Sequence, residues 1–426
     1  MLIYNVRDLD LNRVEEKYRV IVGDLQLVYS SISYYKDRQK FTDDLLEHRT
    51  FSFNLQGSSL VIFPIGSYYR NYVNYIVLDG YKHKILWIQL RNFCDGFLIP
   101  DLNLFIGKEL SSINYRVEMF LQEYKKLDIV DKSDSVSSVI DGWICNQESP
   151  YHYFYDCVPY LREILNKSNL VESVLTSRNR CFSDLSYQLE EIKLSIFKNV
   201  PFSAPQGYFR LLIARDTFTD SAYHRKLLMS FDSELIDRSL AKGSLYFSSG
   251  FFDQFKYIVW MFDTNTKRTC KNVEQFKSKV EDLVFNKLDG NSKALIVHDG
   301  MTKSIYDTNI QDISVVPSTR YNDLLHLSMH DFTYEQKIII AKNSDFFVVD
   351  GSTSSIIPSR FLKQKSFCLV DKDYKKNFKG HYHFNSYFCK CINREFKKNS
   401  WVDDSFQIDL NKFSEAFRYF MNNDDN

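Results

Sequence analysis

The sequence predicts an α/β protein with two Rossmann-like domains that face each other across a cleft, and with a β-rich N-terminal portion. Apolar strand-like runs alternate with helix-like segments from about residue 136 to 245, and a second alternating series runs from residue 251 to the C-terminus. Such alternation is typical of a parallel sheet covered on both faces. The chain has 426 residues, 44% of them hydrophobic, which is enough for two cores. We therefore expect domains at 1–250 and 251–426.

The pattern of short apolar runs in residues 1–110 predicts the β-rich portion. Short apolar runs such as Lys84–Gln89 have the length of strands, and the Asp-Gly pairs between them are typical of turns. We expect one helix near residues 35–48 and another over 110–128, where apolar residues recur at helical spacing. The motifs that suggest chemistry all follow this portion.

The first alternating series, which we expect to form a parallel sheet, contains five elements. They are a strand over 136–145, a helix over 151–167, a strand over 171–176, a helix over 184–198 and a strand over 209–214.

The second series has clearer signals for where helices begin. Asn272 is a favourable N-cap residue, and Thr333-Tyr-Glu-Gln336 is close to the capping-box pattern. The expected strands lie at 256–262, 293–298, 312–316, 345–349 and 366–370, and the expected helices at 273–285, 333–342, 354–362 and 410–421.

Composition argues against several classes of function. Lys plus Arg and Asp plus Glu both number 54, so the formal net charge is zero and no nucleic-acid partner is expected. The N-terminus lacks the pattern of a signal peptide, and no apolar run reaches the roughly 18 residues of a membrane span. The eight cysteines are scattered, which favours reduced thiols in a cytoplasm.

The segment after the first expected strand of the alternating series could carry a catalytic base. Ligands of parallel sheets bind beyond the carboxyl ends of the strands. His152 and Asp156 are four residues apart and would share one face at the start of a helix. The carboxylate could orient the imidazole, which could then take a proton from a hydroxyl nucleophile. Alternatively, Asp156 only favours the helix N-terminus and His152 is a packed aromatic residue.

Two loops of the second series could bind an anion. Arg268 and Asn272 lie where a loop opens a helix, so a guanidinium and backbone N–H groups could bind a diphosphate there. A second loop follows the most apolar strand and offers close backbone approach and hydroxyl donors. Its residues are Gly351, Ser352, Thr353 and Ser354. The structural alternatives are a solvated basic loop and a helix cap.

Two carboxylates of the second series could accept hydrogen bonds from ribose or sugar hydroxyls. Asp299, followed by Gly300, ends an apolar strand, although the same pair also makes plain turns. Glu335, followed by Gln336, lies on the helix before the most apolar strand, although it could be an ordinary exposed helix residue. No metal or other cofactor is expected.

These segments resemble motifs of family-61 glycosyltransferases and related bacterial polysaccharide enzymes. The run from Asn146 to Leu161, with His152-Tyr-Phe-x-Asp156-x-Val-Pro, is similar to their N-x-x-H-[FW]-x-x-[DE]-x-x-P-[RK]-[LI] signature. Phe332-Thr-x-Glu-Gln, followed by Asp345-Phe-Phe-Val-Val-Asp-Gly-Ser352, is similar to their later helix, strand and glycine loop. The likeness covers roughly residues 138–360, and Asp350-Gly351 stands where the family often has His-Gly.

The resemblance implies a GT-B fold and a metal-independent, inverting transfer of a sugar from a nucleotide-sugar donor. The acceptor would be a growing surface polysaccharide, either capsule or lipopolysaccharide. His152 would be the base with Asp156 as its partner, on the acceptor side in 1–250. The domain at 251–426 would bind the donor through Arg268, Asn272, Asp299, Gly300, Glu335, Gln336 and Gly351–Ser354. The enzyme would be cytoplasmic, and a lipid-linked acceptor would draw it to the inner membrane face.

Two other functions stay open. A transferase for a CMP-linked acidic sugar, such as sialic acid or Kdo, would suit His298-Asp299-Gly300 together with the hydroxyl-rich loop that ends at Ser355. A non-catalytic protein that binds a sugar or nucleotide during polysaccharide assembly is the third reading.

Overall fold

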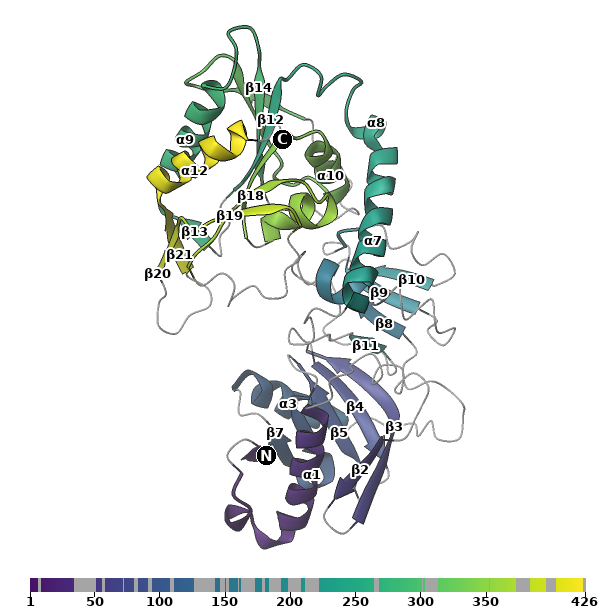
Figure 1. Cartoon of the computed structure of the whole chain (residues 1–426). Helices are drawn as coiled ribbons and strands as arrows, with labels where there is room; N and C mark the ends of the chain where they lie inside the picture. The colour runs from purple at the N-terminus through teal and green to yellow at the C-terminus, as the bar shows by residue number, and fades with distance from the viewer. Residues whose placement is uncertain are drawn as a thin grey trace. The chain divides into compact units, whose positions relative to one another are not determined.

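The computed structural model shows a mixed α/β protein (Figure 1). The structure describes residues 1–6, 9–33, 51–55, 58–71, 73–79, 83–90, 94–107, 111–125, 142–145, 150, 153–159, 161, 173–177, 181–183, 193–197, 208–210, 222–263, 268–300, 302, 313–351, 353–372, 384–395 and 404–423. The helix expected near residues 35–48 lies outside them.

The chain divides into two compact units. Unit 1 comprises residues 1–180 and 185–218, and unit 2 comprises residues 181–184 and 219–426. The expected boundary at 250/251 therefore falls after two helices that belong to unit 2. These helices are α7 (Ala222–Ala241) and α8 (Gly243–Tyr246).

The β-rich portion expected at the N-terminus is present in unit 1. Its sheet has the order β1-β7-β6-β5-β4-β3-β2, and its pairs are antiparallel except for the parallel pair of β1 and β7. Helix α3 (Ser111–Tyr124) covers it, with Phe120 stacked on Tyr75 at 3.8 Å between ring centroids. A helix that was not expected, α1 (Arg19–Ser33), precedes β2. The strands are β1 (Leu2–Asn5), β2 (Phe51–Leu55), β3 (Ser58–Arg70), β4 (Val73–Asp79), β5 (Ile85–Gln89), β6 (Gly96–Ile99) and β7 (Leu104–Gly107).

Unit 1 also contains a parallel sheet with the order β10-β9-β8-β11. The prediction of a helix over 184–198 is wrong for its last part, because Lys193–Phe197 forms a strand. Leu194 and Ile196 recur at the two-residue spacing of a strand, and the segment pairs with β9 along its whole length. The strands are β8 (Gly142–Cys145), β9 (Ser173–Ser177), β10 (Lys193–Phe197) and β11 (Tyr208–Arg210).

Unit 2 is built on a larger sheet with the order β15-β16-β14-β12-β17-β18-β19. All pairs are parallel except the one that β15 forms at the edge. Counted in chain order, the parallel strands follow the sequence 3-2-1-4-5-6, the order of doubly wound nucleotide-binding sheets. The strands are β12 (Tyr257–Phe262), β14 (Ala294–Asp299), β15 (Val315–Pro317), β16 (Leu324–Ser328), β17 (Phe346–Asp350), β18 (Ser366–Leu369) and β19 (Ser386–Cys389).

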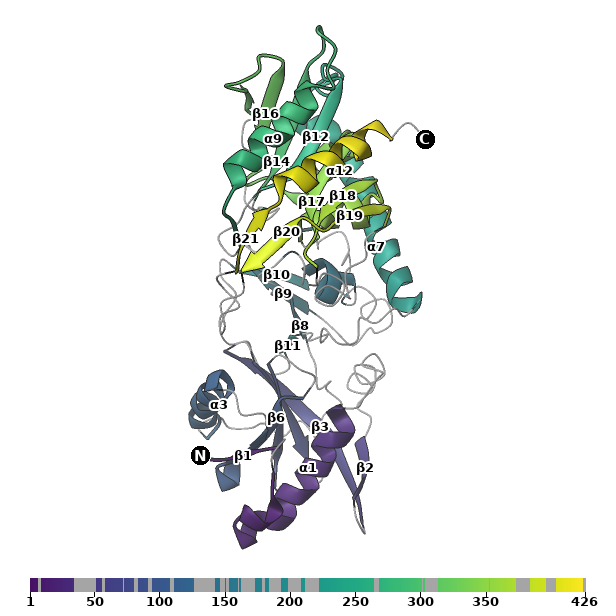
Figure 2. The ribbon, with the colours of Figure 1, turned by 60° about the vertical axis from the view of Figure 1, so that its left-hand side comes forward.

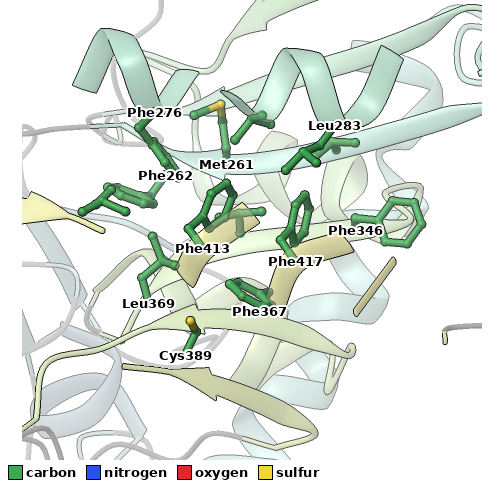
Figure 3. Packing of buried hydrophobic residues seen from close by; sticks show 14 of the residues in the cluster. Met261, Phe262, Phe276, Leu283, Phe346, Phe367, Leu369, Cys389, Phe413 and Phe417 are labelled. Carbon is green, nitrogen blue, oxygen red and sulfur yellow. The ribbon is translucent and has the colours of Figure 1, made fainter. Parts of the chain in front are cut away.

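Helices cover both faces of this sheet. Two helices expected from the sequence, α9 (Val273–Phe285) and α12 (Leu410–Asn422), pack on one face through a core that includes Phe276, Phe413 and Phe417 (Figure 3). Figure 1 shows α10 (Tyr334–Lys342) on the opposite side, where it contacts α7. The apolar runs of the central strands are thus buried from both sides, as parallel strands require.

A three-stranded sheet, which was not expected, adjoins this core with the order β13-β21-β20. Figure 2 shows its strands β20 and β21. Its strands are too short and too polar to be recognised by periodicity. They are β13 (Arg268–Cys270), β20 (Ile392–Glu395) and β21 (Asp404–Ile408). Among the described helices, none has both the length and the apolar character needed to cross a bilayer.

Candidate functional site

Each of the three central strands of unit 2 leads to an aspartate at its carboxyl end. β14 ends at Asp299, β17 ends at Asp350, and Asp263 directly follows β12. The chain continues from β12 toward β14 on one side and from β17 toward β18 on the other. Ligands of doubly wound sheets bind where the strand order reverses in this way. We call the region defined by these three aspartates the switch-point edge.

Asp299 is held by a buried lysine. The ammonium of Lys337, whose side chain is 1% exposed, donates to Asp299 Oδ1 at 2.6 Å, to the Gly300 carbonyl at 2.6 Å and to Thr302 Oγ1 at 3.1 Å. All three ammonium protons are used, so Lys337 fixes the turn after β14 rather than presenting charge to a ligand. Burial raises the pKa of Asp299, and Lys337 opposes this rise.

Gly300 is needed for packing. A Cβ at this position would lie 2.9 Å from the Cα of His330, closer than real Cβ atoms approach a backbone. The Asp-Gly pair at the end of β14 therefore brings two chain segments together, whatever else it binds.

The loop after β17 is closed on itself. Ser354 Oγ donates to Asp350 Oδ1 at 2.6 Å and accepts from the Asp350 backbone N–H at 3.0 Å. The backbone N–H of Gly351 donates to the Leu369 carbonyl at 3.1 Å. Ser352 lies outside the described residues, and only the backbone of Thr353 is described, within the short turn η8 (Thr353–Ser355). Asp350 and Ser354 thus shape one side of the switch-point edge.

Glu335 and Gln336, which were expected to bind a ligand, are engaged by the protein. The carboxylate of Glu335 is 5% exposed and accepts from Lys242 Nζ at 2.9 Å and from the Tyr246 hydroxyl at 3.1 Å. Gln336 completes the predicted capping box with Thr333. These contacts explain how polar residues can occupy a helix whose first eight residues, 334–341, are all buried.

Asn272 is also used inside the fold. It occupies the N-cap position of α9 as predicted, but its side chain does not cap the helix. Its amide instead donates to the Ile408 carbonyl at 2.8 Å and accepts from the Ile408 N–H at 3.0 Å. The backbone of Arg268 pairs with β21, and its side chain is outside the described part of the structure.

The expected base lies beyond what the structure describes. His152 is not among the described residues, and only the backbone of Asp156 is, within the helical turn η5 (Tyr153–Cys157). Of the predicted site residues, the structure brings Asp299, Gly300, Gly351 and Ser354 to one sheet edge. The roles of the others stay predictions.

Sequence reasoning missed a chain of three polar side chains on the α9 face. His298 Nε2 lies 2.8 Å from His326 Nδ1, and His326 Nε2 lies 3.1 Å from Glu281 Oε1. Burial, with a smaller effect of His326 and Lys277, lowers the pKa of His298 to about 4. Burial also lowers the pKa of His326, against the raising effect of Glu281. Nothing in the linear spacing of these residues signals the contact.

The described residues offer no ready metal centre: no group of three His, Cys, Asp or Glu side chains among them could hold an ion. Comparison with models of known protein families, with curated proteins and with solved structures found no match to this chain. The strand order and the switch-point edge are therefore the observations from which a function can be proposed.

Proposed function

We propose that the protein is a glycosyltransferase that moves a sugar from a nucleotide-sugar donor to a growing surface polysaccharide, such as capsule or lipopolysaccharide. The observation that supports this best is the 3-2-1-4-5-6 strand order of unit 2, with Asp299 and Asp350 on either side of its switch point. Nucleotides bind at this position in doubly wound sheets, and a carboxylate there accepts hydrogen bonds from ribose hydroxyls.

The finer proposal is a GT-B enzyme in which unit 2 binds the donor and unit 1 binds the acceptor across a cleft. The parallel sheet of unit 1 is compatible with a second α/β domain. In this proposal His152, partnered by Asp156, deprotonates the acceptor hydroxyl, and Arg268 with nearby backbone N–H groups stabilises the leaving diphosphate. These roles come from the motif resemblance, as do the inverting and metal-independent chemistry.

A thermal-shift panel with UDP-, GDP- and CMP-sugars tests the function directly. Binding raises the melting temperature of the full-length chain, by an amount that depends on nucleotide concentration and affinity. Stabilisation by UDP or GDP compounds would support the proposal, and stabilisation by CMP compounds alone would favour an acidic-sugar donor. No response to any of them would contradict nucleotide-dependent transfer.

Two variants separate donor binding from chemistry. Asp350→Asn should weaken nucleotide binding by about 10-fold or more, because it removes a charged acceptor at the switch-point edge. Asp253→Asn removes an exposed carboxylate of the same unit and is the control. His152→Ala should abolish sugar transfer while leaving nucleotide affinity nearly unchanged. Transfer above a few per cent of wild type would show that His152 is not the base.

A further inference from the structure

The hydrogen-bonded series Glu281–His326–His298 has only one consistent arrangement of protons when both rings are neutral. A carboxylate only accepts hydrogen bonds, so Nε2 of His326 must carry the proton that points to Glu281. A neutral His326 then has an unprotonated Nδ1, which must accept from Nε2–H of His298 at 2.8 Å. His298 is left with its proton on Nε2 and a lone pair on Nδ1.

The hydrogen-bonded series ends at Nδ1 of His298. It is shielded from solvent and has no hydrogen-bond partner among the residues that the structure describes. A buried acceptor without a donor destabilises a fold by about 1–3 kcal/mol. Such atoms are rare in native proteins and require a ligand, a water or a functional reason.

The surroundings of His298 keep it neutral. Lys277 and Asp263 face it from α9 and from the end of β12, and they lie 3.6 Å from each other. Glu281, the carboxylate at the far end, is shared between His326 and Arg320. The low pKa of His298, about 4, agrees with this balance of charges and with its burial. The unprotonated Nδ1 of a neutral ring can accept a hydrogen bond from a donor group, but it cannot bind an unprotonated phosphate oxygen.

The position of His298 relates it to the switch-point edge. It is the residue before Asp299 in β14, and it pairs in register with Met261, two residues before Asp263. Successive residues of a strand point to opposite faces of the sheet. Asp299 therefore reaches α10 through Lys337, while His298 reaches α9 through the chain to Glu281.

We propose that Glu281 and His326 hold His298 in one tautomer so that its Nδ1 accepts a hydrogen bond from a hydroxyl group of the bound nucleotide. Glu281 and His326 are positioning residues, and His298 is the group that touches the ligand. This inference rests on the proposed nucleotide-dependent function and adds to it a rule for the ligand: the group recognised at this point is a donor, and an anion is not accepted.

The tautomer can be measured on the full-length chain without any ligand. Two-bond ¹H–¹⁵N spectra of ¹⁵N-histidine-labelled protein at pH 7 should show His298 with Nε2 protonated and Nδ1 unprotonated, with His298→Gln used for assignment. A protonated Nδ1 would overturn the proposed hydrogen-bonded series. In Glu281→Gln, the ring of His298 should lose this single tautomer. Asp282→Asn is the control, because Asp282 is the next carboxylate on α9 and is hydrogen-bonded to Arg320 and Tyr321.

The ligand is tested with UDP, GDP and CMP and with their 2′-deoxy and 3′-deoxy forms. Removing the recognised hydroxyl should weaken binding to the wild-type chain about 10-fold, and this ratio should fall to about 1 in His298→Phe. If the recognised hydroxyl belongs to the transferred sugar, the roughly 10-fold difference in affinity appears only between nucleotide sugars and their deoxy-sugar forms. If nucleotides bind but neither comparison shows a difference in affinity, a water donates to Nδ1 and only this inference fails. If no nucleotide binds, both proposals fail.

Discussion

The guanidinium of Arg360, in the helical turn η9 (Ile356–Phe361), makes two hydrogen bonds to the carboxylate of Asp232 on α7, at 2.9 and 2.7 Å. The two side chains are 1% and 5% exposed. They are 128 residues apart in the chain. Together with the ion pair of Lys242 and Glu335, this contact explains why α7 belongs to unit 2 although it precedes the alternating series of that unit.

Asp232→Ala should destabilise unit 2 strongly. The substitution leaves the buried guanidinium of Arg360 without its carboxylate, and breaking a buried pair in this way costs about 3–5 kcal/mol. Urea unfolding of the full-length chain measures the change. Asp237→Ala, at an exposed position of the same helix, should change stability by less than about 0.5 kcal/mol. The double variant Asp232→Leu/Arg360→Met should recover much of the loss, and a loss no greater than that of the Asp237 control would contradict the role given to this pair.

Helix α7 also shows why part of the fold could not be predicted. Its buried positions include Leu228, Phe231, Leu235 and Ser239, which have helical spacing. Asp232 belongs to the same stripe, so two of the five positions are polar and the apolar periodicity is broken. From the sequence alone, a carboxylate on a helix is expected to be exposed. The ion pair with the distant Arg360 explains its burial, and that partner cannot be identified from local spacing.

The central strands could be predicted because their signals are local. β12, β14 and β17 are continuous apolar runs, and α10 begins with a capping box that the structure confirms. The site was harder to predict than the strands, because the same residue types bind ligands in some proteins and stabilise the fold in others. Glu335 has the chemistry of a ribose-binding carboxylate, but in the structure it binds Lys242, which lies between α7 and α8.

Lys337→Met should loosen the turn after β14. Its ammonium is the donor that joins Asp299, Gly300 and Thr302, and its removal leaves Asp299 buried without its counter-charge. We expect a loss of about 3 kcal/mol and faster amide exchange over residues 299–302. Lys342→Met, an exposed position of the same helix, is the control. Adding Asp299→Asn to Lys337→Met should restore part of the stability, and unchanged exchange in Lys337→Met would show that the lysine does not fix the turn.

Gly300→Ala should be more harmful than an ordinary glycine substitution. The new methyl group would lie 2.9 Å from the Cα of His330, and a backbone atom cannot move aside as a side chain can. Such overpacking costs about 1–3 kcal/mol. Gly290→Ala is the matched control, since a Cβ there meets nothing within 4 Å. Thermal melting of the two variants compares them directly, and equal melting temperatures would contradict the close approach.

The stability of the protein should fall as the pH decreases from about 6.5 to 4, in part because of His298. Its pKa is about 4 in the folded chain and about 6.5 when unfolded, so the unfolded state binds more protons within this range. The contribution is complete above pH 6.5 and amounts to at most roughly 3 kcal/mol. His326, whose pKa is also lowered, acts in the same direction.

The His298 contribution can be separated by comparing the wild-type chain with His298→Gln at pH 7 and pH 5. Glutamine does not titrate, so the variant escapes the protonation that destabilises the wild type at pH 5. The gap in melting temperature between the two proteins should therefore shift in favour of the variant on acidification. His330→Gln removes an exposed histidine from the same unit, and its gap to wild type should stay nearly constant. If the His298→Gln gap is also constant, His298 does not have the low pKa that its burial imposes, and the neutral hydrogen-bonded series with Glu281 is wrong.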